Sequence, residues 1–460
     1  MSAVRLSPPS QRLLLPIVLS GTFVQLFSVT VVQVGVVDVQ RDLSAGAAET
    51  QLVLAAYTLT YACSLIVSAR LGDKHGYRRM FVAGMALFTA ASIGAAAAPD
   101  VWVLIAGRAL QGFGSGLMAP QILSIIQSAV PANRRPAALS AFGGTMAAAS
   151  LAGPVLGGVL TQLDPLGLGW RAAMLLVVPV GIAALALSPA LPSVHSEHKP
   201  QRVDPVGATL SLLGCALLVF PLAMGRETGW PPWTWASLAL AVLSLTGFVV
   251  SQRRAAEPLI QPSTLAEPAT RWGLAAVLVF NAGVPSFTLP LSMHLQGAKG
   301  WSPLETGLSL TPYAVGALAG SRIANRLGKR FGHRALAASS LAMGLVSIAV
   351  PVVIDLFWLY WLALCVGGVA FGVFTASAFT QIIARVRPEA AASVSGLLPA
   401  AQQLGGTLGV TFAGIAYTAP AATASGALWH AMTYEAAAFA FAALCTIGGQ
   451  RKVARSAVPS

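Results

Sequence analysis

The chain has 460 residues, of which 56% are hydrophobic and only 9% are charged, and its mean hydropathy is +0.73. A soluble domain of this length and composition would precipitate, so most of the surface must face lipid. The net charge of +13 arises from 28 Lys and Arg against 15 Asp and Glu. These basic residues are scattered over short loops, which argues against a nucleic-acid-binding protein, because that would need them on one face.

Fourteen apolar runs are each long enough, at about 20 residues, to cross the core of a bilayer. The first run is too long for a cleavable secretory signal and has no convincing cleavage site, so we expect it to remain as a span. The fold class is therefore an all-α integral membrane protein. The spans are predicted near residues 12–36, 50–69, 79–98, 101–128, 136–161, 171–191, 205–224, 233–251, 270–294, 303–325, 334–352, 356–384, 390–416 and 428–449.

The basic residues orient these spans, because cytoplasmic loops are enriched in Lys and Arg. With the N-terminus in the cytoplasm, Arg108 lies within a span and four basic residues fall outside, namely Arg41, Arg171, Arg226 and Lys299. All the others lie on cytoplasmic segments or their flanks. We therefore predict a multi-pass protein with both termini in the cytoplasm.

A nine-residue repeat divides the chain. Residues 70–78 and 326–334 both begin Arg-Leu-Gly, share a Gly at the seventh position and end in Arg, and each copy lies between two apolar runs. Such a repeat indicates a duplicated membrane protein built from two related halves. The first copy falls between spans 2 and 3 and the second between spans 10 and 11. We therefore predict a six-helix bundle over 1–195, an inserted helix pair with flanking loops over 196–269, a second bundle over 270–450 and a cytoplasmic tail over 451–460.

Several further motifs accompany the repeat: Ala69 to Arg79 around its first copy, Leu104 to Gly116 in span 4, and Gly153, Pro154, Gly157 and Gly158 in span 5. Together they resemble the major facilitator superfamily, and in particular its fourteen-helix drug:proton antiporter family. The resemblance implies two six-helix bundles plus two inserted helices. It also implies secondary active export of a drug, antibiotic or metabolite across a bacterial inner membrane, by alternating access and in exchange for protons.

The first copy of the repeat predicts a gate at the cytoplasmic ends of the helices. Asp73 lies among basic residues near a helix N-terminus, where a carboxylate can pair with arginine and lock the gate. A solvated loop is the alternative for Asp73. Lys329 replaces the acid in the second copy, so only the first copy is expected to lock. The predicted gate residues are Asp73, Arg70, Gly72, Gly76 and Arg78.

Arg108 lies well inside span 4, and burying an unpaired guanidinium there costs at least about 2.5 kcal/mol. It must therefore meet a wet cavity or a partner. The family resemblance implies a role in proton coupling or substrate contact for Arg108 and Gln111, and a structural hydrogen bond is the alternative. In span 5, the glycines and Pro154 permit close helix packing and a kink. The resemblance places that span at the interface on which the bundles rock.

Ser28 stands where the resembling antiporters commonly carry an acidic residue in span 1. The other acids of the spans lie near outer ends, except Glu435, which we place early in span 14. A carrier of lipophilic cations needs a buried anion, so we predict a neutral or anionic amphiphile as substrate. Proton coupling would then use Asp73, Arg108 or a peripheral acid such as Asp38 or Glu435.

The predicted cavity is lined by neutral polar side chains: Ser28, Gln33, Tyr57, Gln121, Asn281, Gln381 and Gln402. An interhelical hydrogen bond is the alternative role for each Gln or Asn. The four cysteines lie in apolar spans without paired spacing, and we interpret them as core packing.

No G-x-x-x-x-G-K-S/T phosphate loop is present, so ATP is not expected to drive transport directly. The histidines are isolated, and we predict no metal, no cofactor and no enzymatic activity. Three alternatives stay open: a lipid or lipid-linked metabolite translocase, favoured by lateral openings between spans 5 and 8 or 2 and 11; a facilitator without proton coupling; and a non-transporting sensor or scaffold. The expected partners are the substrate, protons and membrane lipids, and a monomer suffices.

Overall fold

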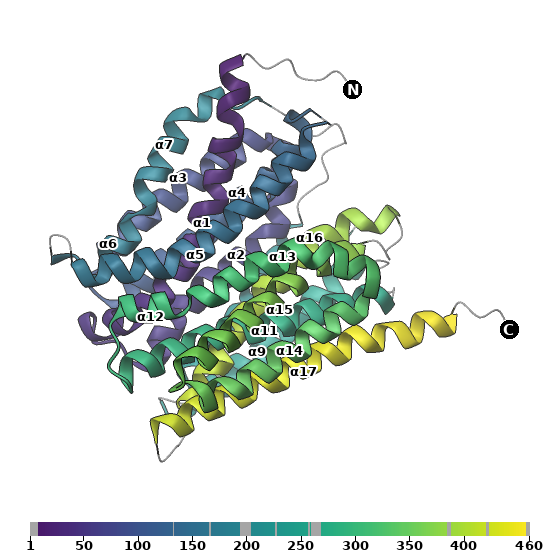
Figure 1. Ribbon diagram of the computed structural model, residues 1–460. Coiled ribbons are helices and arrows are strands. Elements are labelled where there is room, and N and C mark those ends of the chain that lie inside the picture. The colour runs from purple at the N-terminus through teal and green to yellow at the C-terminus, as the bar shows by residue number, and fades with distance from the viewer. Residues whose placement is uncertain are drawn as a thin grey trace.

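The structure, a computed structural model, describes residues 8–131, 133–164, 167–193, 204–225, 228–255, 258, 268–383, 388–419 and 423–456. Within these ranges the regular structure is helical, and the helices form two bundles whose axes diverge toward the two chain termini (Figure 1). The predicted boundary between the first bundle and the inserted pair falls at 194–203, outside the described residues, as does the end of the tail at 457–460.

The helices follow the predicted spans closely. The first bundle contains α1 (Pro8–Asp42), α2 (Ala47–His75), α3 (Tyr77–Ala96), α4 (Val101–Ala129), α5 (Arg135–Leu163), α6 (Trp170–Leu175) and α7 (Val177–Leu187), with a 3-10 turn, η2 (Ser188–Ala190), after α7. The second contains α11 (Pro268–Gly297), α12 (Pro303–Ser309), α13 (Thr311–Phe331), α14 (His333–Val353), α15 (Phe357–Ile383), α16 (Pro388–Tyr417) and α17 (Ala424–Ser456). Because α17 continues to Ser456, most of the segment predicted as a tail extends this helix.

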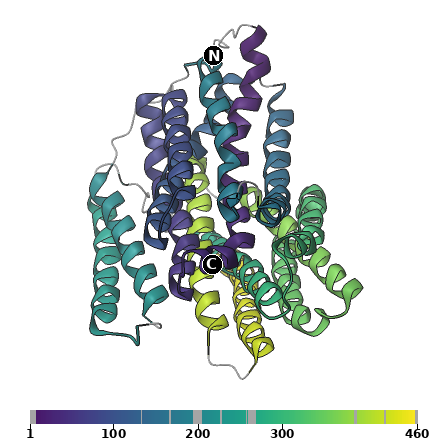
Figure 2. The same cartoon turned by 90° about the vertical axis from the view of Figure 1, so that its left-hand side faces the viewer.

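The inserted pair consists of α8 (Pro205–Met224) and α9 (Pro232–Arg254). Asp204 caps α8 by accepting from the Gly207 backbone N–H at 2.9 Å, and it also accepts from Gln252 Nε2 of α9 at 2.7 Å. The pair stands at one side of the molecule (Figure 2), where α8 packs against α2 of the first bundle and α16 of the second.

Two of the predicted spans are broken helices, and a proline explains each break. Pro179 and Pro312 lack the N–H that would bond to the carbonyl four residues earlier, and the ring clashes with that carbonyl. The first break separates α6 from α7 at Leu176, and the second separates α12 from α13 at Leu310.

Eleven helical stretches in the described part of the chain are long and apolar enough to cross a membrane. The helices α2, α13 and α16 are absent from this set, although each coincides with a predicted span. All three lie at or near the contact between the two bundles, where α2 packs on α16 and α13 packs on α5. A helix shielded from lipid by its neighbours can carry more polar residues, which accounts for the lower hydropathy.

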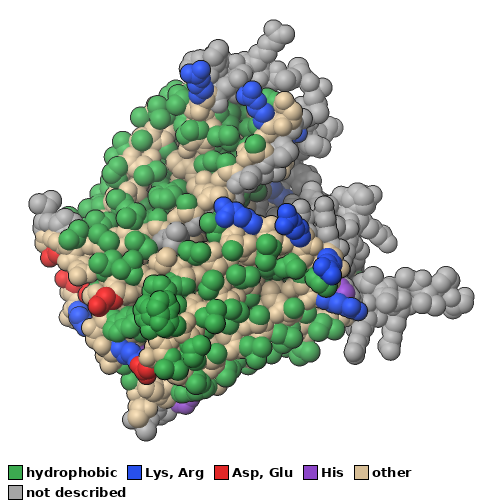
Figure 3. Space-filling view, viewed as in Figure 1, with side chains coloured by type: hydrophobic (Ala, Val, Ile, Leu, Met, Phe, Trp, Pro, Cys, Tyr) green, Lys and Arg blue, Asp and Glu red, His purple; other side chains and the backbone are tan. Residues whose placement is uncertain are grey.

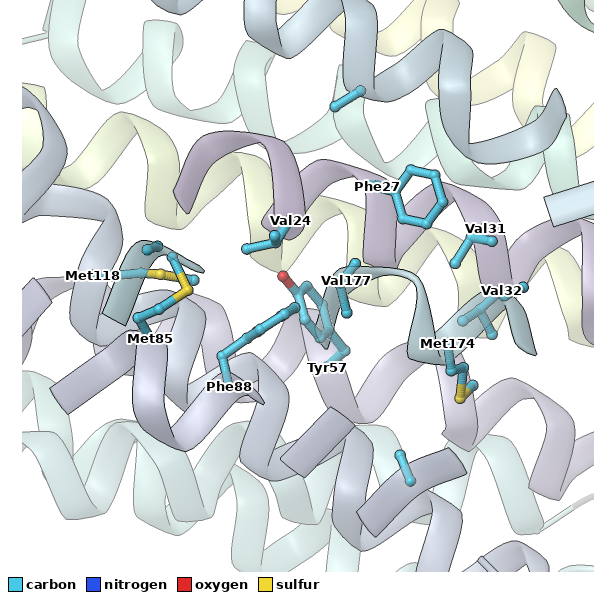
Figure 4. Packing of buried hydrophobic residues seen from close by; sticks show 14 of the residues in the cluster. Val24, Phe27, Val31, Val32, Tyr57, Met85, Phe88, Met118, Met174 and Val177 are labelled. Atoms are coloured by element: carbon cyan, nitrogen blue, oxygen red, sulfur yellow. The ribbon is translucent and has the colours of Figure 1, made fainter. Parts of the chain in front are cut away.

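Each bundle has its own apolar core. In the first bundle, Val24, Phe27 and Val31 of α1 pack with Phe88 of α3 and Met174 of α6 (Figure 4). In the second, Phe280, Phe374 and Phe439 form an aromatic cluster, with the rings of Phe280 and Phe374 stacked. Leu289 of α11 and Val410 of α16 also join the first cluster, so apolar contacts extend across the junction between the bundles.

Charged side chains mark two opposite edges of the molecule (Figure 3). The basic edge is the one toward which both termini run, and it carries the α2–α3 and α13–α14 turns. The acidic edge carries the other set of turns, where Arg171 pairs with Asp42 and Lys299 pairs with Asp355. The apolar band between these edges matches the lipid-facing surface that the composition predicts.

The repeat forms the same tight turn in both bundles. Gly76 joins α2 to α3 with φ 93°, and Gly332 joins α13 to α14 with φ 53°. Residues with a side chain rarely adopt positive φ, which explains the glycine at this position of both copies.

Candidate transport site

Arg108 is buried at the centre of a hydrogen-bond network that joins the four helices α1, α2, α3 and α4. Its Nη1 donates to Ser28 Oγ of α1 at 2.9 Å and to Gln111 Oε1 of α4 at 2.9 Å, and its Nε donates to the Val53 carbonyl of α2 at 3.3 Å. Gln111 in turn donates to Ser92 Oγ of α3 at 2.8 Å. The side chain of Arg108 is only 1% exposed, so these neutral acceptors hold the guanidinium inside the bundle.

Tyr57 forms the second layer of this network. Its ring lies under the guanidinium, with 4.5 Å from Arg108 Cζ to the ring centroid, a cation–π contact. The Tyr57 hydroxyl lies 2.7 Å from Ser115 Oγ and donates to the Gln25 carbonyl at 3.2 Å. The positive charge therefore rests on an aromatic face and hydroxyl and carbonyl oxygens, and no carboxylate pairs with it among the described residues.

The structure thus brings together four of the predicted residues, Ser28, Arg108, Gln111 and Tyr57, but inside the first bundle. Ser28, at the position where the family resemblance leads us to expect an acid, accepts a hydrogen bond from Arg108 through its hydroxyl. Of the predicted cavity residues, Tyr57 is completely buried. Its ring packs in the core beneath the Arg108 guanidinium.

Three described hydrogen bonds cross from one bundle to the other. Thr288 donates to Gln33 Oε1 at 3.2 Å, and Gln296 Nε2 donates to the Val34 carbonyl at 2.9 Å. The hydroxyls of Thr58 and Thr407 lie 2.7 Å apart. All three lie in the half of the molecule next to the acidic edge. Gln33, predicted to line a cavity, therefore helps to join the bundles in this conformation.

The glycines of α5 permit close contacts on two sides. A Cβ on Gly153 would overlap the Thr30 side chain of α1, and one on Gly157 would lie 2.7 Å from Val31 Cγ2. A Cβ on Gly158 would lie 2.7 Å from the Leu304 Cα of α12, in the other bundle. The motif therefore packs α5 against its own bundle and against the second one.

Pro154 contributes to the same inter-bundle contact. Its carbonyl lies so close to Gly307 of α12 that a Cβ there would overlap it. The α5 helix runs unbroken through Pro154. The contact at Gly158 and Gly307 is backbone against backbone, and side chains cannot rearrange to relieve it.

The predicted gate has a different geometry from the one expected. Asp73 accepts a hydrogen bond from the Tyr77 hydroxyl at 2.8 Å, and no ion pair to Asp73 is present among the described residues. Arg70 donates to the carbonyl of Pro258, in the segment that follows α9. Arg78 lines a groove of about 610 Å³ together with His75 and Arg79. Tyr77 follows Asp73 across the tight turn at Gly76, whereas these basic side chains are directed elsewhere.

Two residues predicted to line the cavity lie against the helices that carry the repeat. Gln121 is fully buried, donates to the Ser68 carbonyl at 2.7 Å, and occupies the space where a side chain on Gly72 would lie. In the second bundle, Gln381 Nε2 lies 3.3 Å from a Cβ built on Gly328, the glycine equivalent to Gly72. Both glutamines therefore face the repeat helices.

The remaining cavity predictions lie in the second bundle. Asn281 is buried and donates to the Val277 carbonyl of its own helix at 2.8 Å, while Gln402 is half-buried on α16. For Asn281 the structure favours the alternative role, a structural hydrogen bond.

Sequence reasoning missed two features. Cys63 of α2 and Cys215 of α8 lie close together where these two helices pack, although nothing in their spacing suggests a pair. Glu435 was predicted early in its span, but α17 begins at Ala424 and the residue lies near the middle of the candidate span Ala424–Gly448. The sequence could have shown this depth if the position of Glu435 had been counted from the first residue of its helix.

Comparisons with known proteins agree with this architecture. The family profile of the Major Facilitator Superfamily matches residues 18–410 and 271–452. The probable actinorhodin transporter of Streptomyces coelicolor is 35% identical over 417 residues, covering 87% of this chain and 71% of that protein. The puromycin resistance protein of Streptomyces alboniger is 32% identical, with 94% of this chain and 88% of that protein covered. The cephamycin export protein of Amycolatopsis lactamdurans is 32% identical, with coverages of 84% and 81%.

Solved structures show the same fold at low sequence identity. A bacterial homologue of the human lysosomal transporter Spinster, in an inward-facing conformation, superposes with a TM-score of 0.69 at 17% identity, covering 99% of this chain and all of that one. A peptide transporter in complex with sulfate gives a TM-score of 0.70 at 18% identity, with coverages of 96% and 95%.

Proposed function

The chain belongs to the major facilitator superfamily of membrane transporters, and from this premise we propose that it exports a neutral or anionic organic amphiphile from the cytoplasm in exchange for protons. The protein is a transporter and not an enzyme. Export is the proposed direction because the relatives carry the names of export and resistance proteins.

The environment of Arg108 is the observation that supports a neutral or anionic substrate. A buried guanidinium held by Ser28, Gln111 and an aromatic ring leaves the first bundle with a positive charge that no described carboxylate balances. Such a charge raises the energy of a cationic ligand nearby and lowers that of an anionic or dipolar one. A lipophilic cation is therefore the disfavoured substrate.

We place the basic edge in the cytoplasm, together with both termini, in a bacterial inner membrane. The hydrogen bonds between the bundles then lie toward the outer surface, at Gln33, Val34 and Thr58. In this orientation the structure represents the state closed to the outside. Alternating access would break these contacts and bring the bundles together at the basic edge. A monomer contains all the contacts that this cycle needs.

The seams between the bundles support a soluble amphiphile over a lipid as cargo. They run between α5 and α12–α13 and between α2 and α16, whereas the openings that would favour a lipid translocase lie between spans 5 and 8 or 2 and 11. The first seam is closed near the acidic edge by the backbone contact of Gly158 with Leu304. The second is flanked by α8, which packs on both of its helices.

Everted membrane vesicles from a host without its own drug exporters provide the test. Respiration acidifies their interior, so a proton-coupled exporter accumulates its substrate inside. We would compare ethidium, a cation, with chloramphenicol, which is neutral, and 1-anilinonaphthalene-8-sulfonate, an anion. We expect uncoupler-sensitive accumulation of the neutral or anionic compound. Saturable, pH-dependent accumulation of ethidium would overturn the proposal on charge, and no accumulation of any compound would overturn proton-coupled export.

A matched pair of glycine substitutions on α5 provides the control. Gly158→Leu places a side chain against the backbone of α12 and should abolish accumulation, because the seam cannot close. Gly144→Ala lies on the same helix, but a Cβ there meets nothing within 4 Å, so accumulation should be unchanged. Equal activity of the two variants would contradict the role assigned to this seam.

A further inference from the structure

Glu435 is a completely buried carboxyl at the middle depth of α17. Its exposed fraction is 0%, and it lies on the same helix face as Met432 and Phe439. Met432 belongs to one apolar cluster of the second bundle and Phe439 to the other. The carboxyl group therefore lies between two parts of an apolar core.

The hydrogen bonds of Glu435 are incomplete. Its Oε2 accepts from Ser347 Oγ of α14 at 3.3 Å, a long bond, while Oε1 has no hydrogen-bond partner. A buried acceptor without a partner costs about 1–3 kcal/mol, and an ionised one costs more. Buried polar groups that serve only to hold a fold are usually satisfied, so this one needs another explanation.

No basic group balances Glu435 among the described residues. The titratable group that interacts with it is Tyr313 of α13, whose hydroxyl also lacks a hydrogen-bond partner. Other such groups on α11 and α13–α17 are exposed, lie near an edge or face other partners: Arg271, His294, Arg322, Arg326, Arg330, His333, Arg334, Tyr360, Cys365, Tyr417, His430, Tyr434 and Cys445. In this conformation, the uncharged acid is the form that the site accommodates.

Tyr313 packs against the same two apolar clusters between which Glu435 lies. Its ring stacks between Phe287 of α11 and Phe371 of α15, with centroid distances of 5.8 Å and 5.9 Å. The residue is partly exposed, whereas its hydroxyl oxygen is buried. A small displacement of α13 would therefore open a polar route between Glu435 and the surface that Tyr313 covers.

We propose that Glu435 is the residue that carries the exchanged proton, with Tyr313 covering it. In the state described here the proton is bonded to a carboxyl oxygen. When the bundle rearranges and water reaches the site, that O–H bond breaks, water takes the proton, and the carboxylate remains solvated. The carboxylate takes up a proton from water on the other side before the site closes again. This inference rests on the proposed proton-coupled export.

Infrared difference spectroscopy of the purified protein tests, without any substrate, whether the Glu435 carboxyl holds a proton. At neutral pH, subtracting the Glu435→Gln spectrum from the wild-type spectrum should leave the C=O stretching band of a protonated carboxylic acid, and this band should shift in D₂O. The control is Asp355→Asn, which removes an exposed carboxylate at the acidic edge and should leave no such band. Absence of the band from the wild-type difference at neutral pH would overturn the proposal.

Transport of the same three compounds tests the exchange. Glu435→Gln keeps the shape of the neutral acid but cannot release a proton, so accumulation driven by the pH gradient should be lost. Counterflow of compound against compound, which needs no net proton movement, should remain. Asp355→Asn should retain both activities.

The outcomes separate the two hypotheses. Gradient-driven accumulation at the wild-type rate in Glu435→Gln would overturn the role of Glu435 and leave export standing. If the wild type accumulates no compound, proton-coupled export fails, and the infrared band alone then decides whether Glu435 holds a proton.

Discussion

Each half of the chain buries a charged or chargeable side chain near an equivalent tyrosine, and the two halves treat it differently. Tyr57 and Tyr313 lie the same distance before their copies of the repeat. In the first half Tyr57 lies under Arg108, which donates to hydroxyl, amide and carbonyl oxygens. In the second half Tyr313 lies near Glu435, and both have an oxygen without a partner.

Arg108 carries a permanent charge, whereas Glu435 can be either neutral or charged. A guanidinium keeps its proton at any physiological pH, so Arg108 can only be solvated, and the first bundle supplies that solvation. A carboxyl can be neutral or charged, so incomplete hydrogen bonding leaves room for both forms at different stages of a cycle. We infer that the first half fixes the electrostatic character of the site, whereas the second half carries the change in protonation.

Replacement of Arg108 should produce the largest loss of stability. Arg108→Ala leaves Ser28 and Gln111 without their partner and creates a cavity beside Tyr57, for a combined loss of about 3 kcal/mol. The midpoint of thermal unfolding in detergent should fall by several degrees. Glu435→Gln should shift it little, because the amide fits the site of a neutral acid. If both variants lose equal stability, the proposed difference between the halves is wrong.

The two copies of the repeat provide a second comparison. Gly72→Ala would force the Gln121 amide away from its 2.7 Å bond to the Ser68 carbonyl, for a loss of about 1–3 kcal/mol. Gly328→Ala faces the Gln381 amide at 3.3 Å, and that amide has no hydrogen bond to lose. Because alanine favours the helix by about 1 kcal/mol, this variant should be neutral or more stable. Unfolding midpoints of the pair, measured side by side, would show the asymmetry or refute it.

Removal of the tyrosine hydroxyls should produce a smaller effect. Tyr57→Phe deletes the contacts to Ser115 and to the Gln25 carbonyl, which should lower stability by about 1–2 kcal/mol. Tyr313→Phe deletes a hydroxyl that has no hydrogen-bond partner, so stability should be unchanged or slightly higher. A comparable loss in Tyr313→Phe would show that its hydroxyl is bonded, and Glu435 would then lie in a satisfied network.

The sequence predicted the helices well because each span must satisfy its own backbone in lipid and is therefore visible as an apolar run. The repeat also located the two tight turns, since Gly76 and Gly332 need positive φ. Arg108 stood out because a basic residue within a span always needs an explanation. Each of these features is recognised from a short stretch of sequence, without knowledge of how the helices pack.

The side-chain partners were harder to predict because they depend on how helices rotate against each other. Gln121 and Gln381 were grouped with a cavity by their polarity, but their contacts are with the repeat helices. Asp73 was expected to meet an arginine, but the turn at Gly76 brings the Tyr77 hydroxyl to it, and Arg70 donates to the Pro258 carbonyl. The depth of Glu435 was misjudged because the start of its helix was placed too late.

Cross-linking of Cys63 to Cys215 should have the smallest effect on the protein. This experiment determines whether the inserted helix pair moves with the first bundle. The two thiols lie close together between α2 and α8, whereas Cys365 and Cys445 lie on other helices. Mild oxidation with copper phenanthroline should protect two of the four thiols from alkylation, as measured by mass spectrometry. Vesicles treated in this way should accumulate substrate at the untreated rate, because α8 then moves with α2. Since α8 also packs on α16, a cross-link that stops transport would mean that the inserted pair slides between the halves during the cycle.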